Sequence, residues 1–253
     1  QCHIIARCIR RRRVGILTSM NKRDYKEFET GEWYHLFTRG NGKMDIFRDE
    51  QDYENFQKRL MLVLGKNANT AERTRAPLAQ VIPGRPLSGR ERWTPGAIRI
   101  TPFEADAFTI AANCLMPNHF HFLIRQNTEI PISKLFLKLL TSYSMYFNHK
   151  YNHIGHVFQD RFKAVHIKDD TQLKHLSAYI HANPKVAGLV RDLKKWKYSS
   201  YPEYFGAVAG GVCDTSVILE QFRNRREYEK FVEDSSEDIR ARKDVARELM
   251  IDA

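Results

Sequence analysis

Two short strands joined by a tight turn constrain the fold of this chain more than any other segment. The stretch FTIAANCLMPNHFHFLIR predicts one strand from Phe108 to Met116 and a second strand from His119 to Arg125. Pro117 and Asn118 supply the turn between them, since both residue types favour tight turns. The sequence therefore predicts a β-hairpin, which an antiparallel sheet can be built around.

The second strand of this hairpin has an apolar face and a histidine face. Successive side chains of a strand point to opposite sides of its sheet. Phe120, Phe122 and Ile124 thus share the face that suits a core, and His119 and His121 share the face that we expect to be open. Two imidazoles at alternate positions can converge on one metal ion, because histidine is the commonest transition-metal ligand. Surface histidines or hydrogen-bonded histidines would give the same pattern.

The segments around the hairpin predict an α+β fold. In order along the chain, we expect a strand from Trp33 to Arg39, a helix from a cap at Asp49 to Gly65, the hairpin, a helix capped by Ser133, a strand from Ala164 to Ile167, and a helix that starts at Asp169 or Asp170 and ends at Pro184. This order fits a ferredoxin-like or RRM-like sandwich, in which helices cover one face of an antiparallel sheet.

The chain divides into three parts by composition. Residues 1–30 form a basic extension, and the stretch before Met20 is either upstream of the true start or a basic DNA-binding arm. Residues 31–206 form the folded domain, with a loop insertion at 66–106 that is rich in Pro, Gly and Arg, or else a basic flap over a bound polyanion. Residues 207–253 predict a C-terminal helical appendage.

The charge of the chain indicates a polyanionic partner. The formal net charge is +11 and hydrophobic residues make up 42% of the chain, so a basic, globular protein is expected. An excess of positive charge of this size favours nucleic acid, although a solvated basic surface would also produce it. The four cysteines form no CxxC pair, and no run of about 18 apolar residues exists. We therefore expect a cytoplasmic protein with no membrane partner.

The last helix of the domain carries two further candidate residues. Leu173, Leu176 and Ile180 form its buried stripe, and Tyr179 and Asn183 stand one turn apart at the edge of that stripe. This edge can present a phenol and an amide oxygen to the histidine face. The alternatives are a boundary tyrosine with a solvated hydroxyl group and an asparagine that caps the helix.

Four segments in this order resemble a known family. They are WYHLFTRGNGKMDIF, LMPNHFHFLIRQ, TSYSMYFNHKYNHIGHVFQDRFKA and LSAYIHANPKVAGLV. Over about residues 31–206, the chain closely resembles the REP-associated tyrosine transposases, which belong to the single-tyrosine HUH transposases of bacterial insertion sequences. The resemblance implies that His119 and His121 bind a divalent metal, that Tyr179 is the nucleophile, and that Asn183 completes the metal site. The insertion-sequence branch usually has Gln at this last position.

The resemblance implies a metal-dependent enzyme that cleaves and rejoins single-stranded DNA through a covalent 5′-phosphotyrosine. Two imidazoles and an amide oxygen suit Mg²⁺ or Mn²⁺, because they leave the charge of the ion intact and positions open for substrate. A phenol with a pKa of about 10 needs activation, which the metal or a lysine could supply. The alternatives are a non-catalytic protein that binds hairpin nucleic acid and a phosphohydrolase that uses water. The sequence leaves open whether the protein forms a homodimer.

Basic and polar residues near these motifs are the candidate DNA contacts. They are Arg39 and Asn41 after the first strand, and Gln159, Arg161 and Lys163 in FQDRFKA. Ordinary surface charge is the competing interpretation for each. If these residues bind phosphates, the affinity for single-stranded or hairpin DNA must fall steeply with salt.

Overall fold

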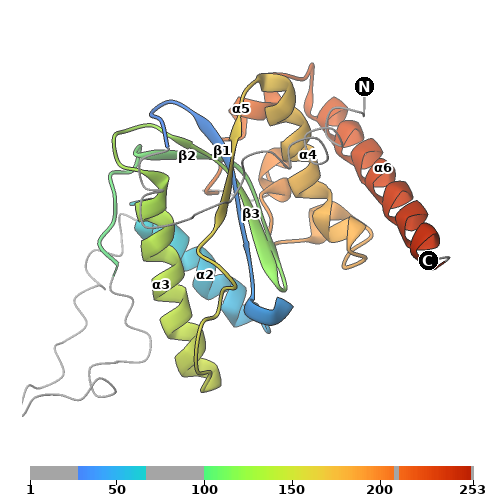
Figure 1. Ribbon diagram of the computed structural model, residues 1–253. Coiled ribbons are helices and arrows are strands. Elements are labelled where there is room, and N and C mark those ends of the chain that lie inside the picture. The colour runs from blue at the N-terminus through green and yellow to red at the C-terminus, as the bar shows by residue number, and fades with distance from the viewer. Residues whose placement is uncertain (1–27, 67–99, 208–210, 252–253) are drawn as a thin grey trace, which may run out of the picture.

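A four-stranded antiparallel sheet forms the centre of the molecule in the computed structural model (Figure 1). The structure describes residues 28–66, 100–207 and 211–251, with 242–251 as backbone only. The strands are β1 (Trp33–Arg39), β2 (Phe108–Met116), β3 (His119–Gln126) and β4 (Lys163–Ile167), in the order β2-β3-β1-β4. The hairpin predicted from the sequence is confirmed, with Met116 paired to His119 across the turn.

Two helices connect the strands and cover one face of the sheet (Figure 1). Helix α2 (Glu50–Val63) links β1 to β2, and α3 (Ile132–Tyr151) links β3 to β4. Each connection joins two strands that have one other strand between them, which is the ferredoxin-like arrangement. The α+β fold class is therefore confirmed.

The expected aromatic core lies between these two helices and the sheet. Its fully buried side chains come from β1, β3, α2 and α3 and include Leu36, Phe56, Phe120, Phe122, Ile124, Phe136 and Tyr143. His121 instead contacts His35 and Tyr179, and Tyr179 packs against a second buried cluster. The assignment of phenylalanines and histidines to opposite faces of β3 is thus confirmed.

The histidine face is covered on its β2 side, where we expected it to be open. Helix α4 (Asp170–Val186) packs against β2 and β3 there, and α6 (Arg225–Ile251) packs against α4. A second buried cluster joins these elements; it includes Ala112, Cys114, Met116, Ile180, Tyr204, Tyr228 and Val232. The physical reason lies in β2, whose residues are nearly all buried, so that both of its faces need a covering layer.

Both ends of α4 depend on side chains that bond the backbone. Asp169 caps the start, because its carboxylate accepts a hydrogen bond from Gln172 N at 2.7 Å. The expectation that Pro184 ends the helix is wrong, since α4 continues to Val186. Asn183 Nδ2 donates to Tyr179 O at 2.9 Å and to Ile180 O at 3.5 Å. The second carbonyl is the one that Pro184 cannot bond, so the asparagine compensates for the missing N–H.

The remaining elements are short, apart from the last helix. They are η2 (Asn41–Lys43), η4 (Leu193–Lys195), η5 (Tyr201–Phe205) and α5 (Ser216–Leu219). The predicted cap at Ser133 is wrong: Pro131 holds the N-cap position of α3, and Ser133 Oγ is buried without a hydrogen-bond partner. Most of the predicted basic extension and loop insertion lies outside the described residues. None of the helices in the described ranges has the length and apolar content that a membrane crossing requires.

Candidate active site

The two predicted histidines stand side by side on β3. Their ring centroids are 5.0 Å apart, with the ring planes at 90°. His121 is only 6% exposed, and burial lowers its pKa well below the ordinary value. The imidazole of His121 is therefore neutral at pH 7, which is the form that can donate a lone pair to a metal.

A third histidine, which sequence reasoning missed, contacts this pair. His35 on β1 has its Nε2 2.9 Å from Nδ1 of His121. It is 9% exposed, and burial lowers its pKa to about 4. Alternation along WYHLFTR places His35 and Phe37 on one face, but their proximity to His121 depends on the pairing of β1 with β3. The sequence alone therefore does not predict the contact between His35 and His121, because that contact depends on the order of the strands.

His119 is held by its neighbour in the turn. Asn118 Oδ1 lies 2.7 Å from His119 Nδ1. An amide oxygen can only accept a hydrogen bond, so Nδ1 of His119 carries the hydrogen, and in the neutral ring Nε2 carries the lone pair. This arrangement resembles the outer-layer contacts that orient histidine ligands in metal sites.

Tyr179 lies against His121, as the sequence predicted for the edge of this helix. The two ring centroids are 5.8 Å apart and the rings meet edge to face. The tyrosine is half-buried, and burial raises its pKa above the ordinary value of 10. The phenol is therefore protonated at neutral pH, and it must lose a proton before or during any attack on phosphorus.

Asn183 follows one turn after Tyr179 on the same helix. Its amide nitrogen bonds the carbonyls of Tyr179 and Ile180, which directs its oxygen away from the helix backbone. Among the described residues, no group of three or more His, Cys, Asp or Glu side chains could hold a metal. The set His119, His121 and the amide oxygen of Asn183 stays a prediction; it would be a set of mixed nitrogen and oxygen ligands.

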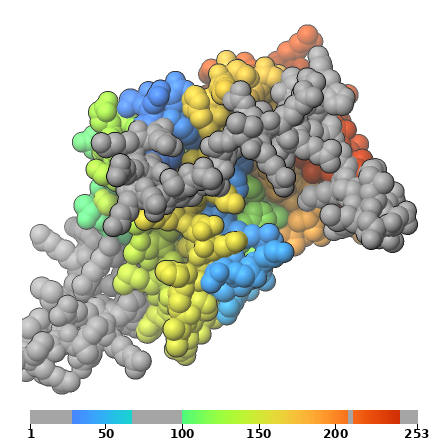
Figure 2. All heavy atoms as spheres, viewed as in Figure 1, coloured from blue at the N-terminus to red at the C-terminus, as the bar shows by residue number. Residues whose placement is uncertain are grey.

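The five predicted DNA contacts gather at one end of the sheet, and all are exposed. Arg39 ends β1 opposite His119, and Gln159 N bonds Arg39 O at 2.9 Å. Asn41 N bonds Val157 O at 2.9 Å, so the segment after α3 lies beside the segment after β1 (Figure 2). Arg161 and Lys163 continue from Gln159 into β4. The fold thus brings together residues that lie more than a hundred positions apart in the chain.

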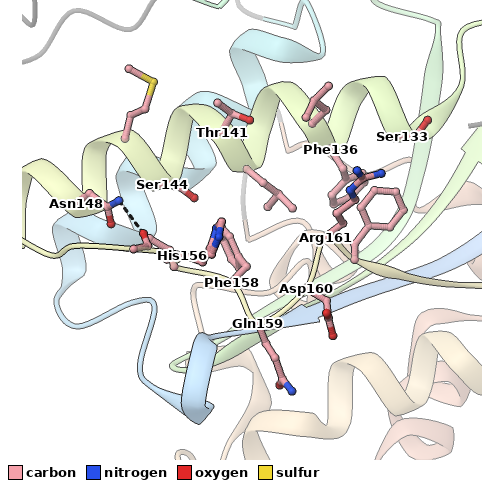
Figure 3. A pocket seen from close by; sticks show the side chains of 16 residues that line it. Ser133, Phe136, Thr141, Ser144, Asn148, His156, Phe158, Gln159, Asp160 and Arg161 are labelled. Atoms are coloured by element: carbon pink, nitrogen blue, oxygen red, sulfur yellow. Dashed lines mark hydrogen bonds between the residues drawn. The ribbon is translucent and has the colours of Figure 1, made fainter. Parts of the chain in front are cut away.

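A groove of about 600 Å³ lies between α3 and the segment 155–162. Phe136, Leu140 and Phe158 line it, together with Gln159 and Arg161. In Figure 3 the side chains of Gln159 and Asp160 extend away from α3, whereas Arg161 lies beside Phe136. The groove is on the α3 side of the sheet, so it is separate from the histidine pair.

Comparisons with known proteins found similarity to transposases. Residues 98–183 match the family model described as "Transposase IS200 like". A Haemophilus influenzae protein that carries the name REP-associated tyrosine transposase is 34% identical over 105 residues, which cover 37% of this chain. The chain spans 59% of the length of that relative.

A solved structure of a REP-associated tyrosine transposase bound to a REP hairpin also matches. Its TM-score is 0.48 at 17% identity, over 79% of this chain and 96% of that chain. The family model covers both histidines, Tyr179 and Asn183. The two sequence matches confirm the resemblance that the four motifs predicted: this chain is similar to a REP-associated tyrosine transposase, and its residues 98–183 match the IS200-like transposase family.

Proposed function

We propose that this protein is a transposase that cleaves and rejoins single-stranded DNA, with Tyr179 as its nucleophile. The contact between the rings of Tyr179 and His121 is the single observation that carries the proposal. It joins residues from two elements, α4 and β3, whose motifs are both typical of the family. The family match over residues 98–183 supports the same activity.

The proposed reaction exchanges one phosphodiester bond for another. The oxygen of Tyr179 attacks phosphorus, and the bond between phosphorus and the 3′ oxygen breaks. The phenol loses its proton, the departing 3′ oxygen gains one, and a 5′-phosphotyrosine remains. Because the phosphodiester energy is kept in this bond, a 3′-OH of another strand can reverse the step and join the DNA.

His119, His121 and Asn183 are the residues that would hold a divalent ion, Mg²⁺ or Mn²⁺. Such an ion, when bound, supplies positive charge that polarises the phosphodiester. The neutral imidazole of His121 and the outward amide oxygen of Asn183 fit this role. Tyr179, which is half-buried beside His121, needs its phenolic proton removed at the moment of attack.

The DNA would approach the end of the sheet where the exposed cations lie. Arg39, Arg161 and Lys163 offer positive charge for phosphates, and Asn41 and Gln159 offer amide groups. Arg39 pairs with His119 across the sheet, and Lys163 pairs with Phe37 near the same end. We therefore propose single-stranded or hairpin DNA as the substrate.

A denaturing gel with end-labelled DNA and Mn²⁺ tests the nucleophile. The parent should form a covalent protein–DNA adduct, and Tyr179→Phe should form none while it binds DNA about as well. The substitution keeps the ring but removes the oxygen that bonds phosphorus. Tyr198→Phe is the matched control, because Tyr198 stacks on Tyr53 away from the histidines. An adduct that persists in Tyr179→Phe would show that another residue attacks.

The same gel separates the competing functions. Cleavage without an adduct in the parent would favour a hydrolase that uses water. DNA binding with neither cleavage nor adduct would favour a non-catalytic protein that binds hairpin nucleic acid.

A further inference from the structure

His35 on β1 lies next to His121 on the neighbouring strand β3, and the two rings meet end to end through one nitrogen of each. Their planes differ by 18° and their centroids are 5.1 Å apart, while Nε2 of His35 and Nδ1 of His121 are only 2.9 Å apart. Nearly coplanar rings joined through their nitrogens form a well-aligned hydrogen bond. Strand pairing fixes this geometry, because β1 and β3 are neighbours in the sheet.

The direction of this hydrogen bond decides what His121 can do. A neutral imidazole carries its hydrogen on one nitrogen and a lone pair on the other. If His121 Nδ1 donates to His35, then Nε2 of His121 has the lone pair and can bind a metal. If His35 donates instead, Nε2 of His121 carries the hydrogen and cannot be a ligand.

We propose that His35 accepts the hydrogen bond from Nδ1 of His121 and thereby holds His121 in the tautomer that binds metal through Nε2. This inference rests on the proposed metal site. His119 offers a parallel, since its Nδ1 faces Asn118 Oδ1, which can only accept. Both histidines then present the same nitrogen as the metal donor.

His35 is thus a positioning residue that acts through His121. Contacts of this kind change metal affinity by about 10- to 100-fold when they are removed. His35→Leu removes the acceptor and leaves His121 free to change tautomer. His35→Gln keeps a side-chain oxygen that can accept from Nδ1. Phe37→Leu is the matched control, because Phe37 lies against both rings but takes no part in the hydrogen bond.

Nitrogen-15 NMR of the His121 ring measures the tautomer directly, without metal. We expect hydrogen on Nδ1 in the parent, in His35→Gln and in Phe37→Leu, and a mixture of tautomers in His35→Leu. Hydrogen on Nε2 of His121 in the parent would overturn the inference.

Titration with Mn²⁺ measures the consequence for the metal site. We expect His35→Leu to weaken binding by about tenfold or more. His35→Gln and Phe37→Leu should stay close to the parent, and His121→Ala should lose specific binding. If the parent binds Mn²⁺ and His35→Leu binds it equally well, the role of His35 fails alone. If the parent binds no Mn²⁺, the proposed metal site fails, and the role of His35 in metal binding fails with it.

Discussion

At the scale of single residues, a buried histidine of the core differs from the buried histidines of the candidate site in the side chains that it contacts. His181 is fully buried in the second core, where Nδ1 pairs with Tyr228 Oη at 2.7 Å and Nε2 with Ser200 Oγ at 2.8 Å. Both of its nitrogens are engaged by groups from the second core. His121 is also buried but has a histidine and a tyrosine among its ring neighbours. The partners, rather than the burial, separate the two roles.

His181 should make the stability of the fold depend on pH. Burial lowers its pKa to about 3, whereas an unfolded chain has the ordinary value of 6.5. Below about pH 6.5 the unfolded chain therefore binds one more proton, and the free energy of unfolding falls as the pH falls towards 3. His181→Gln should reduce this slope by about 1.4 kcal/mol per pH unit. Urea denaturation at several pH values measures the slopes, and parallel slopes would contradict the prediction.

At the scale of elements, α4 is the helix that carries the proposed chemistry. It places Tyr179 against His121 and buries Ile180 in the second core. Its start is fixed by Asp169, and its passage through Pro184 is supported by Asn183. The residue proposed as the third metal ligand thus also supports the helix backbone.

The cap of α4 gives a prediction for stability. Asp169→Ala should lower the free energy of unfolding by about 1 kcal/mol, because it leaves the N–H of Gln172 without its acceptor. Asp170→Ala is the control, since Asp170 lies in the first turn but is not the capping residue. It should cost less, through the helix dipole alone. Thermal or urea unfolding compares the two, and equal losses would show that the cap adds nothing.

At the scale of the whole molecule, the net positive charge and the cations at one end of the sheet both favour binding of a polyanion. The net charge of +11 is spread over the chain, but the fold brings Arg39, opposite His119, and Lys163, opposite Phe37, to one end of the sheet. Long-range attraction brings a polyanion to the surface, and the local cations set where it is held.

DNA affinity should therefore fall steeply as salt rises, and Arg161 should account for part of that slope. Arg161→Ala should weaken binding and reduce the slope of log affinity against log salt by about 0.7, the value for one phosphate contact of a single strand. Lys230→Ala is the control, because Lys230 is exposed on α6, which packs against α4. Fluorescence anisotropy at several salt concentrations measures both. An unchanged slope for Arg161→Ala would remove this residue from the interface.

The sequence by itself determined the local features of this protein. The bounds of β1 and β2, the cap at Asp49 and the two faces of β3 follow from residue type and period, and the structure has them as expected. The candidates His119, His121, Tyr179 and Asn183 also came from motifs and spacing. Such features depend on neighbours within a few positions, so they can be predicted from one sequence.

Only the tertiary structure decided how these elements cover one another. The pairing of β1 with β3 places His35 within hydrogen-bond distance of His121. Because the second face of β2 is apolar, α4 packs on the histidine side of the sheet, and α6 packs on α4. These outcomes depend on burial and hydrogen bonding between segments far apart in the chain, and no local period encodes such contacts.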